Sequence, residues 1–419
     1  MKLPELLSPA GTLKNMRYAF AYGADAVYAG QPRYSLRVRQ NDFDKLDNLA
    51  QGITEAHGQG KKFYVACNLL PHNAKLKTFI DDMVPIIDMQ PDALIMADPG
   101  LIMLVRERWP QQDIHLSVQA NTMNYAAVKF WHTLGLTRII LSRELSLEDI
   151  AEIRCQCPDT ELEVFVHGSL CIAYSGRCLL SGYINHRDAN QGTCTNACRW
   201  NYKLHAAKED EIGVHLLEEK ERPGKYLPIF EDENGTYIMN SKDLRAIQHI
   251  KTLMEIGIDS VKIEGRTKSY YYVARTAQIY RQAIDDIAAD KDFDISLLQD
   301  LDNLANRGYT EGFYRRHVPE EQQNYLSNNS VNGQQQFVGE VLGYTGEMLD
   351  IEVKNHFERG DDLELILPDG NQCFKLEQLE DQYNNTIEIA PGSGHTVRIN
   401  PPSLVKADYG LLAKNLCIG

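Results

Sequence analysis

The sequence predicts a (β/α)8 barrel of the TIM type with a cysteine-rich insertion, followed by a small C-terminal all-β barrel domain. Three observations lead to this prediction. Short apolar runs alternate with amphipathic stretches through the first 270 residues, four cysteines gather between residues 171 and 198, and the chain changes to short β-type runs after about residue 337. Repeated strand–helix units indicate a parallel sheet with crossover helices, and eight of them can close into a circle.

The predicted barrel strands are apolar runs of four to eight residues. They are Glu5–Ser8, Ala26–Ala29, Lys62–Leu69, Ala93–Ala97, Ile114–Val118, Arg138–Leu141, Leu162–Val166 and Ser260–Ile263. Helical patterns lie between most of them, at Leu13–Tyr22, Leu46–His57, Lys75–Met89, Ala126–Leu134 and Leu147–Arg154, and the helix Tyr270–Ala289 closes the region. An open doubly wound sheet is the alternative, although no Gly-x-Gly-x-x-Gly follows the first strand, which disfavours its dinucleotide-binding version.

The domain boundaries follow from shifts in composition. We expect a barrel over residues 1–320 that is interrupted by a metal-binding insertion at 167–235, a linker rich in Asn and Gln at 321–336, and a β domain at 337–419. The acidic runs 209–211, 218–219 and 231–233 are interpreted as a solvated surface loop. After the insertion we expect an extended run at Thr236–Asn240 and a helix near Leu244–Ile256.

The C-terminal region reads as short strands separated by Gly, Asp and Asn turns. The expected strands are Phe337–Leu342, Met348–Val353, Asp362–Leu367, Cys373–Leu376, Thr386–Ile389 and Thr396–Ile399. The sequence Leu367-Pro-Asp-Gly-Asn371 is typical of a hairpin turn.

Charge and hydropathy narrow the class of protein. No run of about 18 apolar residues exists, so we expect no membrane span, and the start of the chain lacks a long apolar signal region, so we expect a cytoplasmic protein. The net charge of -15 argues against a protein that coats nucleic acid over its whole surface, but it leaves room for a local basic site.

The cysteines point to a metal site. Nine cysteines in a chain without a signal region argue against a disulfide scaffold. Cys171, Cys178, Cys194 and Cys198 have the spacing Cys-x6-Cys-x15-Cys-x3-Cys and begin at the end of a predicted strand. Converging thiolates need a metal to neutralise them. The spacing matches neither paired zinc knuckles nor a ferredoxin pattern. Spacing alone therefore leaves three interpretations open: four unrelated buried thiols, a structural zinc site, or an iron–sulfur site.

Basic residues form three islands after neighbouring strands of the predicted barrel. Residues 164–205 contain four basic residues against one acid, and residues 31–40 and 266–282 contain basic residues and no acid. Basic side chains neutralise phosphates and aromatic rings stack on bases, so this arc is a candidate site for a single-stranded RNA loop. The candidate RNA-binding residues are Arg33, Arg37, Arg39, Arg177, Arg199, Lys268 and Tyr271. The alternative is that the arginines are solvated and that the tyrosines of the last helix pack on the barrel.

Polar residues at strand ends are candidates to line a pocket, because barrel enzymes place their chemistry at the carboxyl ends of the strands. Arg143, His167, Glu264 and Arg266 are the candidate catalytic residues. Two guanidinium groups suit a small dicarboxylate. Taken alone, His167 is as consistent with a structural role.

Several motifs resemble those of the U32 peptidase family over nearly the whole chain. They include Pro4-Glu-Leu-Leu-Ser-Pro-Ala-Gly11, the cysteine segment from Glu163 to Ser181, Gln191-Gly-Thr-Cys-Thr-Asn-Ala-Cys-Arg-Trp200 and Lys262-Ile-Glu-Gly-Arg266. The resemblance implies a barrel with a small β domain, a [4Fe-4S] cluster on the four clustered cysteines, and hydroxylation of the wobble uridine in the anticodon loop of tRNA to 5-hydroxyuridine, with prephenate as hydroxyl source.

Other activities remain as alternatives. Some U32 members act on ribosomal RNA or on a quinone ring, and the family label is peptidase or collagenase. Neither Gly-x-Ser-x-Gly nor His-Glu-x-x-His occurs in the chain, which disfavours a protease. A Cys171–His167 pair is conceivable for proteolysis, but it would leave the other three clustered cysteines without a role. A non-catalytic RNA-binding protein with a structural metal is the third class.

Overall fold

The fold was analysed in a computed structural model of the chain. The structure describes residues 2–31, 33–36, 41–170, 173–174, 195, 197, 200, 202–206, 214–219, 226–232, 235–236, 242–306, 308–315, 335–401, 403 and 406–416.

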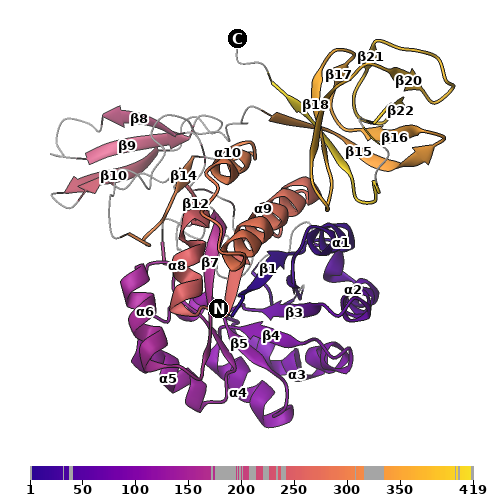
Figure 1. Ribbon diagram of the computed structural model, residues 1–419. Coiled ribbons are helices and arrows are strands. Elements are labelled where there is room, and N and C mark those ends of the chain that lie inside the picture. The colour runs from indigo at the N-terminus through magenta and orange to yellow at the C-terminus, as the bar shows by residue number, and fades with distance from the viewer. Residues whose placement is uncertain are drawn as a thin grey trace.

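Eight parallel strands form a closed barrel, as the sequence predicts (Figure 1). They are β1 (Glu5–Pro9), β2 (Ala26–Gly30), β3 (Lys62–Cys67), β4 (Ala93–Met96), β5 (Ile114–Leu116), β6 (Arg138–Ile140), β7 (Glu161–Ser169) and β13 (Ser260–Ile263). Each strand pairs with the next in the chain, β1 pairs with β13, and β13 pairs with β7, which closes the ring. All five residues of β2 are buried, as expected for a strand covered on both faces.

Helices cover the outside of the barrel. They are α1 (Leu13–Ala21), α2 (Leu46–Gly58), α3 (Asn73–Asp88), α4 (Pro99–Arg108), α5 (Tyr125–Thr133), α6 (Leu147–Gln156), α8 (Ile250–Ile256) and α9 (Tyr270–Ala288), with α10 (Ser296–Asp302) packed on α9. Short 3-10 turns occur at Asp42–Asp44, Val118–Ala120 and Ile247–His249. Ser269 precedes helix α9, and its hydroxyl accepts a hydrogen bond from the backbone N–H of Tyr272 and so caps the first turn.

The region after the insertion differs from the prediction. The expected helix Leu244–Ile256 begins instead with a strand, β12 (Asp243–Arg245), and only its second half is α8. Strand β7 is nine residues long and extends past the barrel, so its last residues pair antiparallel with β12. Strand β12 in turn pairs with β14 (Tyr309–Thr310). The helical expectation was wrong because an apolar run can satisfy either a helix or a strand.

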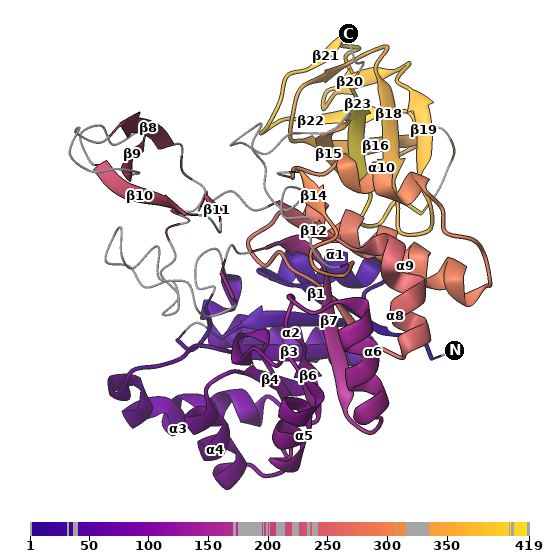
Figure 2. The same ribbon diagram turned by 90° about the vertical axis from the view of Figure 1, so that its left-hand side faces the viewer.

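The acidic part of the insertion is a small antiparallel sheet and not a simple loop (Figure 2). Its strands are β8 (Tyr202–Ala206), β9 (Val214–Glu219), β10 (Tyr226–Asp232) and β11 (Gly235–Thr236). Glu218 and Glu219 belong to β9, and Glu231 and Asp232 belong to β10. The acidic run 209–211 lies outside the described residues, and so does most of the expected extended run Thr236–Asn240.

A second β unit follows the barrel. Its seven-stranded antiparallel sheet, which curls into a half-barrel, has the order β19-β18-β23-β15-β16-β22-β20. The strands are β15 (Gln335–Thr345), β16 (Met348–Val353), β18 (Asp362–Ile366), β19 (Gln372–Lys375), β20 (Leu379–Asp381), β22 (Thr396–Ile399) and β23 (Leu411–Asn415), with a separate pair β17 (Phe357–Glu358) and β21 (Ile389–Ala390). The hairpin turn after Leu367 is confirmed, because β18 pairs antiparallel with β19. The expected strand Thr386–Ile389 is reduced to an isolated bridge and part of β21, and β23 was not predicted.

The C-terminal sheet packs on helices α1 and α9 of the barrel (Figures 1 and 2). Glu340 of β15 accepts hydrogen bonds from Lys14 (2.5 Å), Tyr18 (2.8 Å) and Tyr270 (2.9 Å). Tyr271 stacks on Phe337 with ring centroids 4.6 Å apart. The expected linker 321–336 falls almost wholly outside the described residues. A search of the described helices finds none with the length and hydrophobicity of a membrane span.

Candidate active site at the carboxyl end of the barrel

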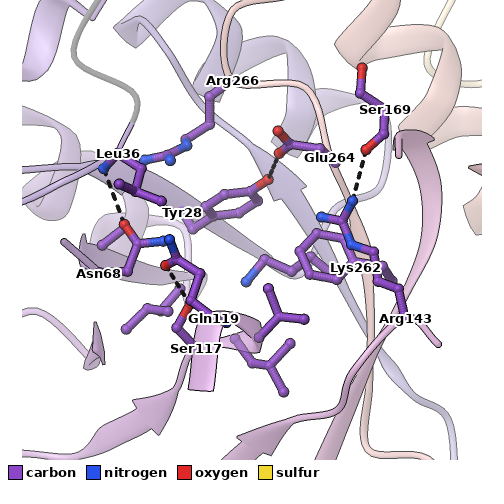
Figure 3. A pocket seen from close by; sticks show the side chains of 15 residues that line it. Tyr28, Leu36, Asn68, Ser117, Gln119, Arg143, Ser169, Lys262, Glu264 and Arg266 are labelled. Atoms are coloured by element: carbon purple, nitrogen blue, oxygen red, sulfur yellow. Dashed lines mark hydrogen bonds between the residues drawn. The ribbon is translucent and has the colours of Figure 1, made fainter. Parts of the chain in front are cut away.

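A cavity of about 120 Å³ opens at the carboxyl ends of the barrel strands (Figure 3). Residues from almost every strand end contribute to it. They are Tyr28, Leu36, Ala66, Asn68, Ile95, Ser117, Val118, Gln119, Ile140, Arg143, Phe165, Ser169, Lys262, Glu264 and Arg266. This is the end of a barrel at which enzymes of this architecture carry their active sites.

Arg143 follows β6 and lies along one wall. Its guanidinium carbon is 3.8 Å from the centroid of the Phe165 ring, and its Nη1 donates a hydrogen bond of 2.7 Å to the carbonyl of Ser169. The stacking on the ring and the hydrogen bond together fix the plane of the guanidinium. Other N–H groups of the guanidinium are left for a ligand. Within the part of the chain that the structure describes, Nε of Arg143 has no hydrogen-bond partner.

Arg266 comes from the loop after β13 and is only 8% exposed. Its Nη1 donates to the hydroxyl of Ser35 at 2.7 Å, and its guanidinium carbon is 5.6 Å from the centroid of the Tyr28 ring. Gly30 lies beneath this pair: a Cβ at residue 30 would be 2.7 Å from Nη1 of Arg266. The absence of a side chain at the end of β2 therefore makes room for the guanidinium.

Glu264 is the cavity's carboxylate. Its Oε2 accepts hydrogen bonds from the Tyr28 hydroxyl (2.8 Å) and from the backbone N–H of Gly265 (3.0 Å). Burial, reinforced by the neighbouring Glu264 carboxylate, raises the pKa of Tyr28 well above its usual value. The phenol therefore stays protonated and donates to Glu264.

Lys262 is a cavity residue that was not predicted. It lies two residues before Glu264, and alternation along β13 directs both side chains to the barrel interior. Its Nζ donates to Glu163 at 2.8 Å and lies 4.3 Å from the centroid of the Tyr28 ring. Burial lowers the pKa of Lys262, although the Glu163 carboxylate opposes the shift.

Two amides complete the polar lining. The side-chain carbonyl of Asn68 accepts from the backbone N–H of Leu36 (3.3 Å), and that of Gln119 accepts from the Ser117 hydroxyl (3.1 Å). Among the described residues, Nε2 of Gln119 has no hydrogen-bond partner. Gln119 lines the cavity on the side opposite Glu264 (Figure 3).

His167 does not line the cavity, so the structure corrects its expected place. Its side chain is fully buried outside the barrel interior, with the rings of Tyr272, Tyr280 and Tyr309 at centroid distances of 5.4–5.8 Å. The register between β7 and β13 shifts between Lys262 and Ile263, which turns residue 167 away from the interior. Burial lowers the pKa of His167 to about 3, so it is a neutral core residue. The structure brings together Arg143, Glu264 and Arg266 of the four predicted residues.

The predicted RNA-binding residues divide into three groups. Arg33 is half-exposed and ion-paired with Asp82 at 2.8 Å, and Lys268 is partly buried, with Nζ 5.1 Å from the Tyr272 ring centroid. Tyr271 is 8% exposed, stacked on Phe337 and hydrogen-bonded to Gln335, so its ring is not available to a base and the prediction for it was wrong. Four arginines lie outside the described residues, namely Arg37, Arg39, Arg177 and Arg199.

The predicted cluster ligands also lie outside the described residues. They are Cys171, Cys178, Cys194 and Cys198. The first follows Leu170 directly in the sequence, and the carbonyl of the neighbouring Ser169, a residue of the cavity wall, accepts the hydrogen bond from Arg143. Four thiols in one segment are a donor set suited to an iron–sulfur cluster. The described part of the chain contains no group of three or more His, Cys, Asp or Glu placed to hold a metal ion.

Comparison with known proteins covers both units. The family model for peptidase family U32 matches residues 11–324, and that for the U32 C-terminal domain matches residues 333–413. The chain is 61% identical to tRNA hydroxylation protein P of Escherichia coli, over 98% of this chain and 97% of that one. It is 59% identical to tRNA hydroxylation protein P of Haemophilus influenzae, over 99% and 96% of the two chains. A 23S rRNA 5-hydroxycytidine synthase of Escherichia coli is 30% identical over 95% of this chain and 58% of its own length. The chain therefore belongs to peptidase family U32.

Proposed function

We propose that this chain is a tRNA-modifying enzyme that hydroxylates the wobble uridine in the anticodon loop to 5-hydroxyuridine, with prephenate as the hydroxyl source. The observation that carries the proposal is the similarity of about 60% identity, over nearly the full length, to two proteins named for tRNA hydroxylation. The finer assignments go beyond this similarity. The wobble uridine is taken from the family resemblance, and prephenate from that resemblance together with the charged groups of the cavity.

The cavity supports a small anionic co-substrate. Arg143 and Arg266 present planar guanidinium groups and Lys262 adds a basic amine, whereas Glu264 is the one carboxylate among the described residues that border the space. Guanidinium groups bind carboxylates through paired hydrogen bonds, and a closed barrel interior strengthens such contacts because it excludes water. A dicarboxylate such as prephenate fits this charge pattern.

A [4Fe-4S] cluster is proposed on Cys171, Cys178, Cys194 and Cys198. Bound there, the cluster would supply redox or Lewis-acid chemistry. The residues around the cavity would do the remaining work: Arg143 and Arg266 bind and orient the carboxylates, and the protonated Tyr28 holds Glu264 in place.

The barrel order supports an RNA site at the same end. Strands β7, β13, β1 and β2 are consecutive in the ring. The basic islands at 31–40, 167–205 and 266–282 follow three of these strands in the sequence, which supports an RNA site on one arc of the same rim. The rest of the chain is acidic and would repel phosphates. RNA is therefore expected to bind locally, at this arc, and in a salt-sensitive way.

Ribosomal RNA is the second candidate substrate, because one relative at 30% identity is named as a 23S rRNA 5-hydroxycytidine synthase. Hydroxylation of a quinone ring by related chemistry is a further alternative. Proteolysis is disfavoured, since His167 is buried with a pKa lowered to about 3 and is no base for Cys171.

The test is nucleoside analysis by mass spectrometry of RNA from a strain that lacks the gene for this chain. We expect 5-hydroxyuridine to disappear from tRNA and to return when the intact gene is supplied. Unchanged tRNA, together with a hydroxylated nucleoside lost from ribosomal RNA, would transfer the activity to the second candidate.

A further inference from the structure

The side chain of Lys262 is an amine inside the cavity. It is 2% exposed and extends from the middle of β13 into the space beside the Tyr28 ring (Figure 3). A lysine that only supported the fold would not need to border a cavity, and the other cations of the cavity, Arg143 and Arg266, cannot lose their protons at ordinary pH. Among the described residues that line the cavity, Lys262 is the one primary amine.

The surroundings of Lys262 tolerate its neutral form. Glu163, its hydrogen-bond partner at 2.8 Å, is also 3.3 Å from Nη1 of Arg138. Arg138 in turn pairs with Glu5 at 2.6 Å. When Lys262 gives up its proton, Glu163 keeps Arg138 as an ionic partner and is not left as a lone buried charge. Burial and the positive charge of Arg266 both lower the pKa of Lys262.

A neutral buried amine next to carboxylate-binding groups has a characteristic reaction partner. Lysines become nucleophiles toward carbonyl groups when burial or a neighbouring cation lowers their pKa. Arg143 and Arg266 border the same 120 Å³ space, so a carboxylate held by them would keep an adjacent ketone within the small volume that Lys262 reaches. The matching substrate class is a 2-oxo acid, in which the ketone is bonded directly to the carboxylate.

We propose that Lys262 forms an imine with the ketone of a 2-oxo acid bound in the cavity. The inference rests on the proposed function, since prephenate is itself a 2-oxo acid, and it assigns a covalent role to a residue of the same site. It makes Lys262 a catalytic residue that holds the small molecule while the RNA is bound.

The reaction balances without an oxidant or a reductant. Nζ first transfers a proton to Glu163 and then attacks the ketone carbon, so that a C–N bond forms and the carbonyl oxygen becomes a hydroxyl group. That hydroxyl leaves as water after it takes up a proton returned through Glu163. The net change is an ammonium and a ketone converted to an iminium and water.

The test is reductive trapping on the full-length protein, purified without oxygen. The protein is incubated with pyruvate, as the simplest 2-oxo acid, or with prephenate, each with sodium cyanoborohydride, and then digested for peptide mass spectrometry. We expect a reduced adduct on Lys262, with labelling at least tenfold above that of the exposed Lys291. Propionate, which lacks the ketone, is expected to give no adduct.

Two variants separate a covalent role from a purely ionic one. Lys262→Arg keeps the positive charge beside Glu163 but forms no imine, and Lys291→Arg is the matched surface control. We expect Lys262→Arg to lose the adduct and hydroxylation together while it keeps its circular dichroism spectrum and its iron content. Trapping needs no RNA, so a Lys262 adduct on a wild-type protein that does not hydroxylate tRNA would count against the proposed function alone. Wild-type protein labelled no more on Lys262 than on Lys291, or hydroxylation retained by Lys262→Arg, would overturn the imine.

Discussion

The guanidinium of Arg266 occupies the space that a side chain at Gly30 would need. A Cβ added at residue 30 would lie 2.7 Å from Nη1 of Arg266 and 2.6 Å from the hydroxyl oxygen of Ser35, the group to which that nitrogen donates. Gly30→Ala should therefore displace the guanidinium, which is the mobile end of a long side chain, and lower hydroxylation about tenfold while the free energy of unfolding changes by about 1 kcal/mol or less.

The control for this substitution is Gly58→Ala. An added Cβ there meets nothing within 4 Å, and the helix α2 gains up to about 1 kcal/mol from alanine. Activity of both variants is measured with tRNA as substrate, and stability by urea denaturation. Full activity in Gly30→Ala would show that the position of the guanidinium is not important.

Arg266→Ala removes the guanidinium itself. Charge-assisted hydrogen bonds contribute about 1.5–3 kcal/mol each, so hydroxylation should fall by about 10- to 100-fold or more. The absorbance of the proposed cluster should be unchanged. The matched control, Arg359→Ala, removes an exposed arginine that follows β17 in the C-terminal unit and should leave activity intact. A wild-type rate in Arg266→Ala would exclude Arg266 from the site.

The proposed cluster predicts that iron depends on particular cysteines. Protein purified without oxygen should be brown and contain iron and sulfide, and Cys171→Ser or Cys194→Ser should lower both, because a cubic cluster needs four thiolate ligands. Cys155→Ser is the control, since this exposed thiol lies outside the motif. Equal iron in all three variants would contradict the ligand assignment.

RNA binding is tested by charge reversal. We expect Arg33, Arg37 and Arg39 changed together to Glu to weaken tRNA binding strongly, and each lost phosphate contact to lower the slope of log affinity against log salt by about 0.7–0.9. Reversal of Lys251, Lys291 and Lys406, three exposed lysines elsewhere, should have little effect. Titrations at several salt concentrations measure both quantities, and an unchanged slope in the arginine variant would mean that RNA docks on another surface.

We expect the buried His167 to make the free energy of unfolding, rather than catalysis, depend on pH. Its pKa is about 3 in the folded state and about 6.5 when exposed, so the unfolded state binds the extra proton between these values. This residue's contribution to folding is complete above pH 6.5 and is lost toward pH 3, by at most about 1.4 kcal/mol per pH unit. His167→Gln should flatten the stability profile between pH 7 and 5 relative to wild type, and the exposed His132→Gln should not. Denaturant titrations at both pH values measure the difference.

The barrel was predictable because its strands are short, apolar and regularly spaced. Strand β12 was not, since a three-residue strand at the start of an apolar run is recognised only by its partner, the projecting end of β7. Arg143, Glu264 and Arg266 followed from their places at strand ends. Lys262 did not, because a lysine inside a strand suggests an exposed position until its partner Glu163, 99 residues away, is known.

The two mistaken site residues have separate causes. His167 is at a strand end, but the register shift opposite it reverses the face to which its side chain points. Tyr271 is in a basic, aromatic stretch, and its partner Phe337 belongs to the other unit of the chain. Neither the register of two distant strands nor a contact between units leaves a local trace in sequence.

Glu340 ties the C-terminal sheet to the two helices that flank the closing seam of the barrel. Lys14 and Tyr18 lie on α1, which follows the first strand, and Tyr270 lies on α9, which follows the last. During synthesis the seam between β1 and β13 can form only after residue 263 has left the ribosome, and it receives this cross-link only after residue 340 has followed. A chain interrupted before that point keeps the strand ladder and the packing of α9 on α1, but it lacks this cross-link and exposes the tyrosines that the sheet would cover. Loss of the last domain is therefore expected to act on the lifetime of the barrel, even where the cavity is untouched.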